Sequence, residues 1–115
     1  MYQSSNRRDY DRRVFAEPVR ATIELSTPYE DVQSLGLREI IVLDMSAGGI
    51  KFACKTEFTV NHLAIYKIEM NLSEKDLTMY GKIIRKRKLT QGFFEYGLRF
   101  DYDYKDQKKL KILYD

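Results

Sequence analysis

The feature that most constrains the fold is a repeated alternation of apolar and polar residues in short segments separated by turn signals. Residues 19–25 show the pattern in full, because Val, Ala, Ile and Leu alternate there with Arg, Thr and Glu. A period of two places successive side chains on opposite faces of a strand. The sequence therefore predicts a domain built from half-buried β-strands.

Five further segments are expected to be strands. Residues 40–43 form a continuous run of apolar, mostly β-branched residues, which predicts a strand buried on both faces. Turns are expected at residues 44–49 and 73–76, and a hairpin at Gln91-Gly92. The predicted strands lie near residues 19–25, 40–43, 50–55, 66–72, 77–83 and 94–100.

The tail changes period, since Leu110, Leu113 and Tyr114 share one face of a helix. Six strands followed by a helix predict an all-β fold, a six-stranded antiparallel β-barrel with a C-terminal α-helix. Closure of a barrel removes exposed strand edges. The barrel domain is expected to cover residues 14–115. Residues 1–13 are polar, show neither period, and are predicted to be a flexible, arginine-rich arm.

Composition limits the class of protein. A chain of 115 residues with 43% hydrophobic and 32% charged residues is typical of one globular domain. No window approaches the ~20 apolar residues of a membrane-spanning helix, and the N-terminus lacks the apolar stretch of a secretory signal. The single cysteine, Cys54, cannot form an internal disulfide. These features predict a cytoplasmic protein.

Catalysis has little support in the sequence. His62 is the one histidine and is expected in a turn, whereas Cys54 is expected on the apolar face of a strand. No group of His and Cys residues has the spacing of a metal site, and no glycine-rich loop has the P-loop or dinucleotide-binding form. We therefore expect neither an enzyme nor a bound metal or cofactor.

Two short motifs carry chemistry. The arm contains two arginines spaced by four, Arg8 and Arg12, and the segment after residues 40–43 reads Asp-x-Ser-x-x-Gly from Asp44 through Ser46 to Gly49. Each motif has a structural alternative. The arginines can belong to a solvated arm, while Asp44 and Ser46 can bond nearby backbone amides and the glycines can supply positive φ in a tight turn.

Taken together, the two motifs suit a guanine nucleotide. Guanidinium groups form bidentate hydrogen bonds with phosphates and with the O6 and N7 edge of guanine. A carboxylate can accept hydrogen bonds from N1 and N2 of guanine, a hydroxyl can bind beside it, and a glycine permits close approach. An arginine arm that orders over a fixed Asp/Ser/Gly rim would couple binding to a disorder-to-order change.

The order of these motifs resembles the PilZ family. In that family an R-x-x-x-R arm precedes the first strand and a (D/N)-x-S-x-x-G turn joins the second and third strands. The resemblance continues through Gly-Ile-Lys-Phe at residues 49–52, residues 80–85 and Tyr-Gly-Leu-Arg-Phe at residues 96–100, and covers nearly the whole chain. It implies a six-stranded barrel of the split-barrel type with a C-terminal helix, and a site for cyclic di-GMP.

The resemblance implies ligand-binding roles for Arg7, Arg8, Arg12, Asp44, Ser46 and Gly49. By matching positions, the spaced arginines hold phosphates and guanine, the aspartate and serine bind a guanine edge, and the glycine gives close approach. The ligand is often a stacked pair in this family. The residue just before the arginine motif, here Arg7, affects that number, so the stoichiometry stays open.

Three other arginines are weighed for the site. Arg13 follows Arg12 directly and can replace it in one contact. Arg85 and Arg87 continue the inward face of the fifth predicted strand, and an unpaired arginine is costly inside a barrel. They are therefore expected to emerge at the barrel rim, where they either touch the ligand or are solvated.

Two rival functions remain. The first is a PilZ-like adaptor that acts by protein contact without a nucleotide, although adaptors of that kind usually lack the arginine pair. The second is a small nucleic-acid-binding barrel that uses the basic run at residues 82–88 with exposed tyrosines as a stacking surface. A cyclic di-GMP receptor would in addition signal to a downstream protein that the sequence does not identify.

Overall fold

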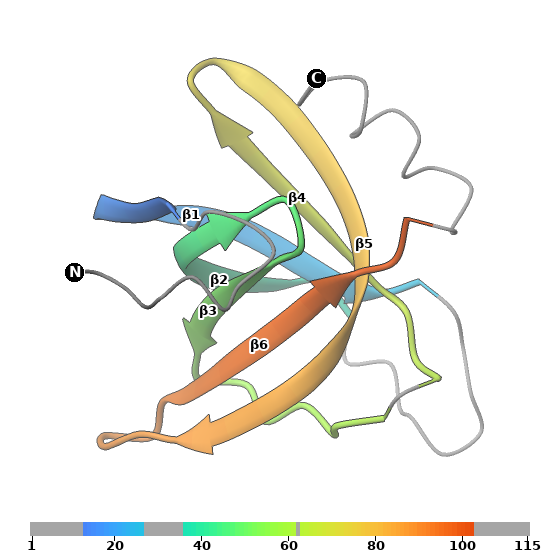
Figure 1. The fold of residues 1–115 in the computed structure, drawn as a ribbon. Helices are drawn as coiled ribbons and strands as arrows, with labels where there is room; N and C mark the ends of the chain where they lie inside the picture. Colours follow the sequence, from blue (N-terminus) through green and yellow to red (C-terminus); the bar gives the residue numbers. More distant parts are fainter. Residues whose placement is uncertain (1–12, 27–35, 62, 103–115) are drawn as a thin grey trace, which may run out of the picture.

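The computed structural model describes residues 13–26, 36–61 and 63–102. The strands are β1 (Arg13–Leu25), β2 (Arg38–Ser46), β3 (Gly49–Cys54), β4 (Tyr66–Leu72), β5 (Lys75–Lys88) and β6 (Phe94–Phe100). They close into an antiparallel barrel in the order β1-β2-β3-β6-β5-β4 (Figure 1). The predicted six-stranded barrel is confirmed. The predicted C-terminal helix lies outside the described residues, and the described part of the chain contains no helix.

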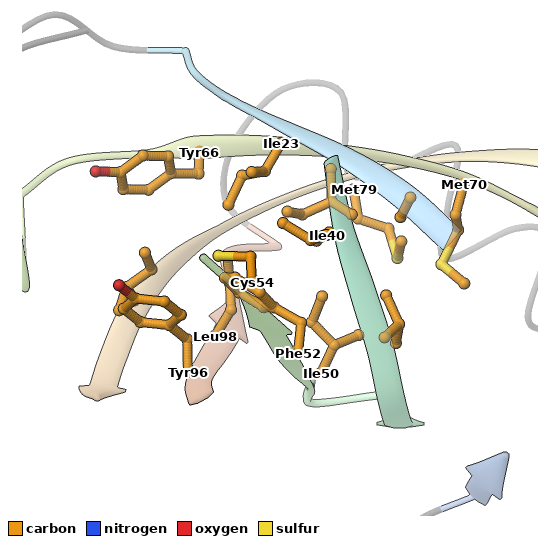
Figure 2. Packing of buried hydrophobic residues seen from close by; sticks show 14 of the residues in the cluster. Ile23, Ile40, Ile50, Phe52, Cys54, Tyr66, Met70, Met79, Tyr96 and Leu98 are labelled. Atoms are coloured by element: carbon orange, nitrogen blue, oxygen red, sulfur yellow. The ribbon is translucent and has the colours of Figure 1, made fainter. Parts of the chain in front are cut away.

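The barrel interior is filled by alternate residues from all six strands (Figure 2). Phe52 and Tyr96 stack in this core with ring centroids 5.1 Å apart. Cys54 is a buried free thiol in this core, and burial raises its pKa. The largest fully buried side chains are Tyr96, Phe52, Ile23, Ile40, Ile50, Ile68, Met79, Ile83 and Val42. These residues leave the outer face of the barrel to the polar positions of each strand.

Two hairpins are closed by residues with positive φ. The turn between β4 and β5 consists of Ser73 (φ 53°) and Glu74 (φ 67°), because Leu72 already pairs with Lys75. It is shorter than the turn expected at residues 73–76. The predicted hairpin at Gln91-Gly92 is confirmed between β5 and β6, where both residues again have positive φ.

A β-bulge at Leu43 changes the face of β2. Val42 pairs with Phe52 and Asp44 with Lys51, so Leu43 is an extra residue relative to β3. A one-residue insertion reverses the faces of all the residues that follow. The expectation that residues 40–43 are buried on both faces is wrong, because Ile41 and Leu43 are only half-buried.

A second bulge has the same effect in β5. Ile83 pairs with Leu98 and Arg85 with Gly97, so Ile84 is the extra residue. Arg85 and Arg87 therefore lie on the outer face, and the expectation that they continue the inward face is wrong. Lys86 takes the inward position opposite Tyr96. It lies at the rim, where its Nζ is 2.8 Å from the Glu57 carboxylate.

The first strand begins beside the hairpin that joins β2 and β3. β1 starts at Arg13, earlier than the expected start at residue 19, and Arg13 and Val14 pair with Met45 and Asp44. The register then shifts between Val14 and Val19. The pairing at Arg13 places the end of the predicted arm next to the Asp-x-Ser-x-x-Gly motif.

Candidate functional site

The Asp-x-Ser-x-x-Gly motif forms a tight hairpin on the outer face of the barrel. Asp44 and Ser46 are the last residues of β2 on that face, and Gly49 is the first residue of β3. The connecting turn is therefore Ala47 and Gly48 alone, and the expected turn over residues 44–49 is too long. Asp44 and Ser46 are 5% and 9% exposed and are the only buried polar side chains among the described residues.

The turn is held by three hydrogen bonds. The Gly48 amide donates to Ser46 Oγ at 3.1 Å, the Phe100 amide donates to the Gly48 carbonyl at 2.9 Å, and the Tyr102 hydroxyl donates to the Ala47 carbonyl. The structural alternative for Ser46, a bond to a nearby amide, is therefore confirmed. It leaves the Ser46 hydroxyl hydrogen available for a further bond, because a hydroxyl both accepts and donates.

The Asp44 carboxylate lies next to a lysine that the sequence does not single out. Lys51 is the cross-strand neighbour of Asp44, and Nζ lies 3.5 Å from Oδ2. The Lys51 side chain is 45% exposed, whereas that of Asp44 is 7% exposed. A cation at this position offsets part of the cost of burying a carboxylate. The contact between Asp44 and Lys51 depends on the bulge at Leu43, which the sequence does not reveal. The sequence indicates only that Lys51, between the apolar Ile50 and Phe52, points outward.

Gly49 is needed by the barrel itself. A Cβ atom at this position would lie 2.1 Å from the Leu98 carbonyl oxygen, so only glycine allows β3 to approach β6 here. The described glycines with positive φ are Gly36 and Gly92, so the structural alternative in which Gly48 and Gly49 supply positive φ in the turn is wrong. The close approach at Gly49 is made by the chain's own backbone.

The structure brings three of the six candidate residues together. Asp44, Ser46 and Gly49 share one hairpin, and the backbone of Arg13 pairs with Met45 between the first two. The remaining candidates, Arg7, Arg8 and Arg12, lie outside the described residues. The outer face next to the hairpin also carries cations, since Gly49 pairs with Arg99 and Arg99 with Lys82.

Three of the five cations in the basic run at residues 82–88 have carboxylate partners among the described residues. The ion pairs are Lys82–Asp101 at 4.0 Å, Lys86–Glu57 at 2.8 Å and Arg87–Glu95 at 2.9 Å. Of the described tyrosines, Tyr66, Tyr80 and Tyr96 are buried and Tyr102 is half-buried. The described part of the barrel therefore lacks the exposed tyrosines on which the nucleic-acid hypothesis depends.

The described residues show neither a metal-binding group of side chains nor a membrane-spanning helix. Within residues 13–26, 36–61 and 63–102, no three His, Cys, Asp or Glu side chains are grouped so as to hold a metal ion. His62 lies outside these ranges. The same ranges contain no helix with the length and hydropathy needed to cross a membrane.

The fold and the hairpin define a class: a small closed β-barrel domain with a polar hairpin on the outside of the barrel. The chain belongs to the PilZ domain family, because the model of that family matches residues 6–113. The match includes the arm arginines and every described strand. Among curated proteins, no significant match was found.

Several solved structures share the fold. The Bacillus subtilis inhibitor of motility MotI/DgrA superposes with a TM-score of 0.63 at 17% identity, over 91% of this chain and 48% of its own. The PilZ domain of Escherichia coli YcgR with c-di-GMP gives 0.59 at 18% identity, over 92% and 87%. The K. pneumonia MrkH–c-di-GMP complex gives 0.61 at 18% identity, over 94% and 50%. This chain therefore spans about half the length of MotI and MrkH.

Proposed function

We propose that this domain is a receptor for cyclic di-GMP that acts by binding and not by catalysis. The observation that carries the proposal is the pairing of Arg13 with Met45, because it brings the residue that follows Arg12 to the hairpin that presents Asp44 and Ser46. Membership of the PilZ family supports the same ligand, as do the complexes of YcgR and MrkH with c-di-GMP.

Each residue of the site has a defined role in the proposal. The Asp44 carboxylate accepts hydrogen bonds from N1 and N2 of guanine, and the Ser46 hydroxyl donates beside it. Arg12 is one peptide unit from Arg13, which places its Cα ~3.8 Å from the start of β1. Arg8 lies four residues further along the arm. Both guanidinium groups can therefore reach a ligand that is bound at the hairpin, where they hold phosphates and a guanine edge.

The signal would pass through the arm. Binding would order residues 1–12 against the barrel and so create a new surface for an unidentified downstream protein. Arg7 would influence whether one ligand or a stacked pair is bound. The proposal places the domain in the cytoplasm, and the free, buried thiol of Cys54 is in keeping with a reducing compartment.

Calorimetric titration of the purified domain tests the proposal. We expect saturable binding of cyclic di-GMP, with a stoichiometry that distinguishes one ligand from a pair, and no binding of cyclic di-AMP or GTP. A folded protein that does not bind cyclic di-GMP would overturn the receptor function and favour the adaptor that acts by protein contact. Affinity that is indifferent to nucleotide identity and falls steeply with salt would instead favour a nucleic-acid-binding barrel.

A further inference from the structure

Gly97 differs from the other glycines inside the strands. A Cβ at Gly49 or Gly81 would lie 2.1 or 2.4 Å from a backbone carbonyl oxygen, so the barrel requires glycine at both positions. A Cβ at Gly97 would meet only the Arg85 side chain, at 3.5 and 3.7 Å, which is ordinary contact. Neither φ nor backbone packing demands a glycine there. A glycine inside a strand often marks a bulge, a tight bend or the close approach of a ligand or another backbone, and Gly97 pairs with Arg85 directly after the bulge at Ile84.

Gly97 lies in the same row as Asp44. Asp44 pairs with Lys51 across β2 and β3, Lys51 with Gly97 across β3 and β6, and Gly97 with Arg85 across β6 and β5. Residues that pair directly across neighbouring strands share one face of the sheet. These four residues therefore form one continuous row on the outer face, along strands that follow one another around the barrel (Figure 1).

Gly97 lies between two cations in this row. Lys51 and Arg85 flank Gly97, which has no side chain, and Arg85 Nε is 3.7 Å from the position that a Gly97 Cβ would occupy. The Arg85 side chain therefore extends over β6. Both cations are open to solvent, with the Lys51 side chain 45% exposed. Arg85 forms no ion pair with any described residue, whereas Arg87 is 2.9 Å from the Glu95 carboxylate.

We infer that Lys51, Gly97 and Arg85 extend the proposed ligand site, with the phosphates of cyclic di-GMP lying over Gly97 between the two cations. The inference rests on the proposed function and adds contacts that neither motif contains. Strands lie about 4.8 Å apart, so Gly97 is roughly 10 Å from Asp44 across the sheet. When a guanine binds the Asp44 carboxylate, the sugar–phosphate ring of the ligand can extend toward Gly97 on β6. A guanidinium and an ammonium group are the side chains that bind phosphate most strongly.

Arg85→Gln and its matched control Arg87→Gln test the inference by titration with cyclic di-GMP. Both arginines are exposed on the outer face of β5, but only Arg87 has a carboxylate partner. We expect Arg85→Gln to weaken binding by about tenfold or more and to make the remaining affinity less sensitive to salt. Arg85→Lys should recover part of the loss, and Arg87→Gln should bind like the wild type.

Gly97→Val tests whether the ligand needs the absence of a side chain at Gly97. The valine side chain would fill the space between Lys51 and Arg85 while favouring the strand, so we expect the unfolding midpoint to be kept and the affinity to fall by about tenfold or more. Gly97→Ala, whose Cβ fits at ordinary contact distance, should fold like the wild type and lose less affinity.

The outcomes separate this inference from the proposed function. If the wild type binds cyclic di-GMP and Arg85→Gln binds no more weakly than Arg87→Gln, the receptor function stands and the extended site is wrong. The same holds if a folded Gly97→Val binds like the wild type. If the wild type does not bind the ligand at all, the proposed function is overturned, and the extended site with it.

Discussion

Asp44 lies on the outer face of the barrel opposite Lys51, with Oδ2 3.5 Å from Nζ. Uninterrupted alternation from Ile40 and Val42 would instead have turned Asp44 into the core. The bulge at Leu43 reverses the faces, so that Met45 packs inside against Ile50 while the carboxylate faces outward. One extra residue thus moves the carboxylate from the apolar interior to the outer face, next to Lys51.

The ion pair itself is expected to contribute little to stability. Lys51→Gln should lower the free energy of unfolding by less than about 1 kcal/mol, because the lysine side chain is half exposed and the pair is screened by salt. Urea denaturation measures this, with Lys67→Gln, from the exposed pair Lys67–Glu69, as control. A loss above about 2 kcal/mol would show that Lys51 is a structural partner of Asp44.

The arm arginines are expected to matter for binding and not for folding. Arg8→Ala and Arg12→Ala should each cost on the order of 1.5–3 kcal/mol of binding free energy, because each removes a charged hydrogen bond. The unfolding midpoint should not change. Calorimetry and thermal unfolding measure the two effects, with the exposed Arg38→Ala at the start of β2 as control. Wild-type affinity in Arg8→Ala would mean that the proposed register of the arm is wrong.

Gly49 and Gly97 are expected to respond in opposite ways to alanine. Gly49→Ala places a methyl group 2.1 Å from the Leu98 carbonyl oxygen, so β3 must move away from β6, at a cost of about 1–3 kcal/mol or more. Gly97→Ala meets no such contact and should leave stability unchanged or raise it by about 0.4–1 kcal/mol. Thermal unfolding of the two variants checks this, and equal destabilisation would contradict it.

Tyr96 is expected to make stability fall in strong alkali. Its hydroxyl donates to the Thr56 carbonyl at 2.8 Å and accepts from the Phe58 amide at 2.7 Å. Burial raises the pKa of Tyr96 to about 12 from an ordinary value of 10.0. Because the folded pKa lies above the unfolded one, the stabilisation is complete below pH ~10 and is lost as the pH rises towards ~12.

Comparison with Tyr96→Phe isolates this titration. Phenylalanine leaves the Thr56 carbonyl and the Phe58 amide without their partner, so the variant should be less stable at neutral pH by about 1–3 kcal/mol. Phenylalanine has no hydroxyl proton to lose. The difference in free energy of unfolding between Tyr96→Phe and the wild type should therefore become smaller between pH ~10 and ~12. Denaturation at a series of pH values measures it. A constant difference across that range would show that Tyr96 does not titrate there.

The number of strands and most of the core could be predicted from local pattern. In residues 66–72 and 94–100 the apolar positions follow a period of two, and the inward residues of β4 and β6 are those that the alternation indicates. The two motifs were likewise visible as residue types at fixed spacing, and they led to the PilZ family. These features depend on neighbouring residues alone, so the chain carries them before it folds.

Which residues lie on the outer face beside the hairpin was decided only by the tertiary structure. The bulges at Leu43 and Ile84 exist relative to partner strands far along the chain, and each one reverses the side chains that follow. For that reason Arg85 lies on the outer face and not on the expected inner face, and Lys51 lies beside Asp44. The contact between Gly97 and the Arg85 side chain also depends on which strands lie next to each other, because the two residues meet only when β5 pairs with β6.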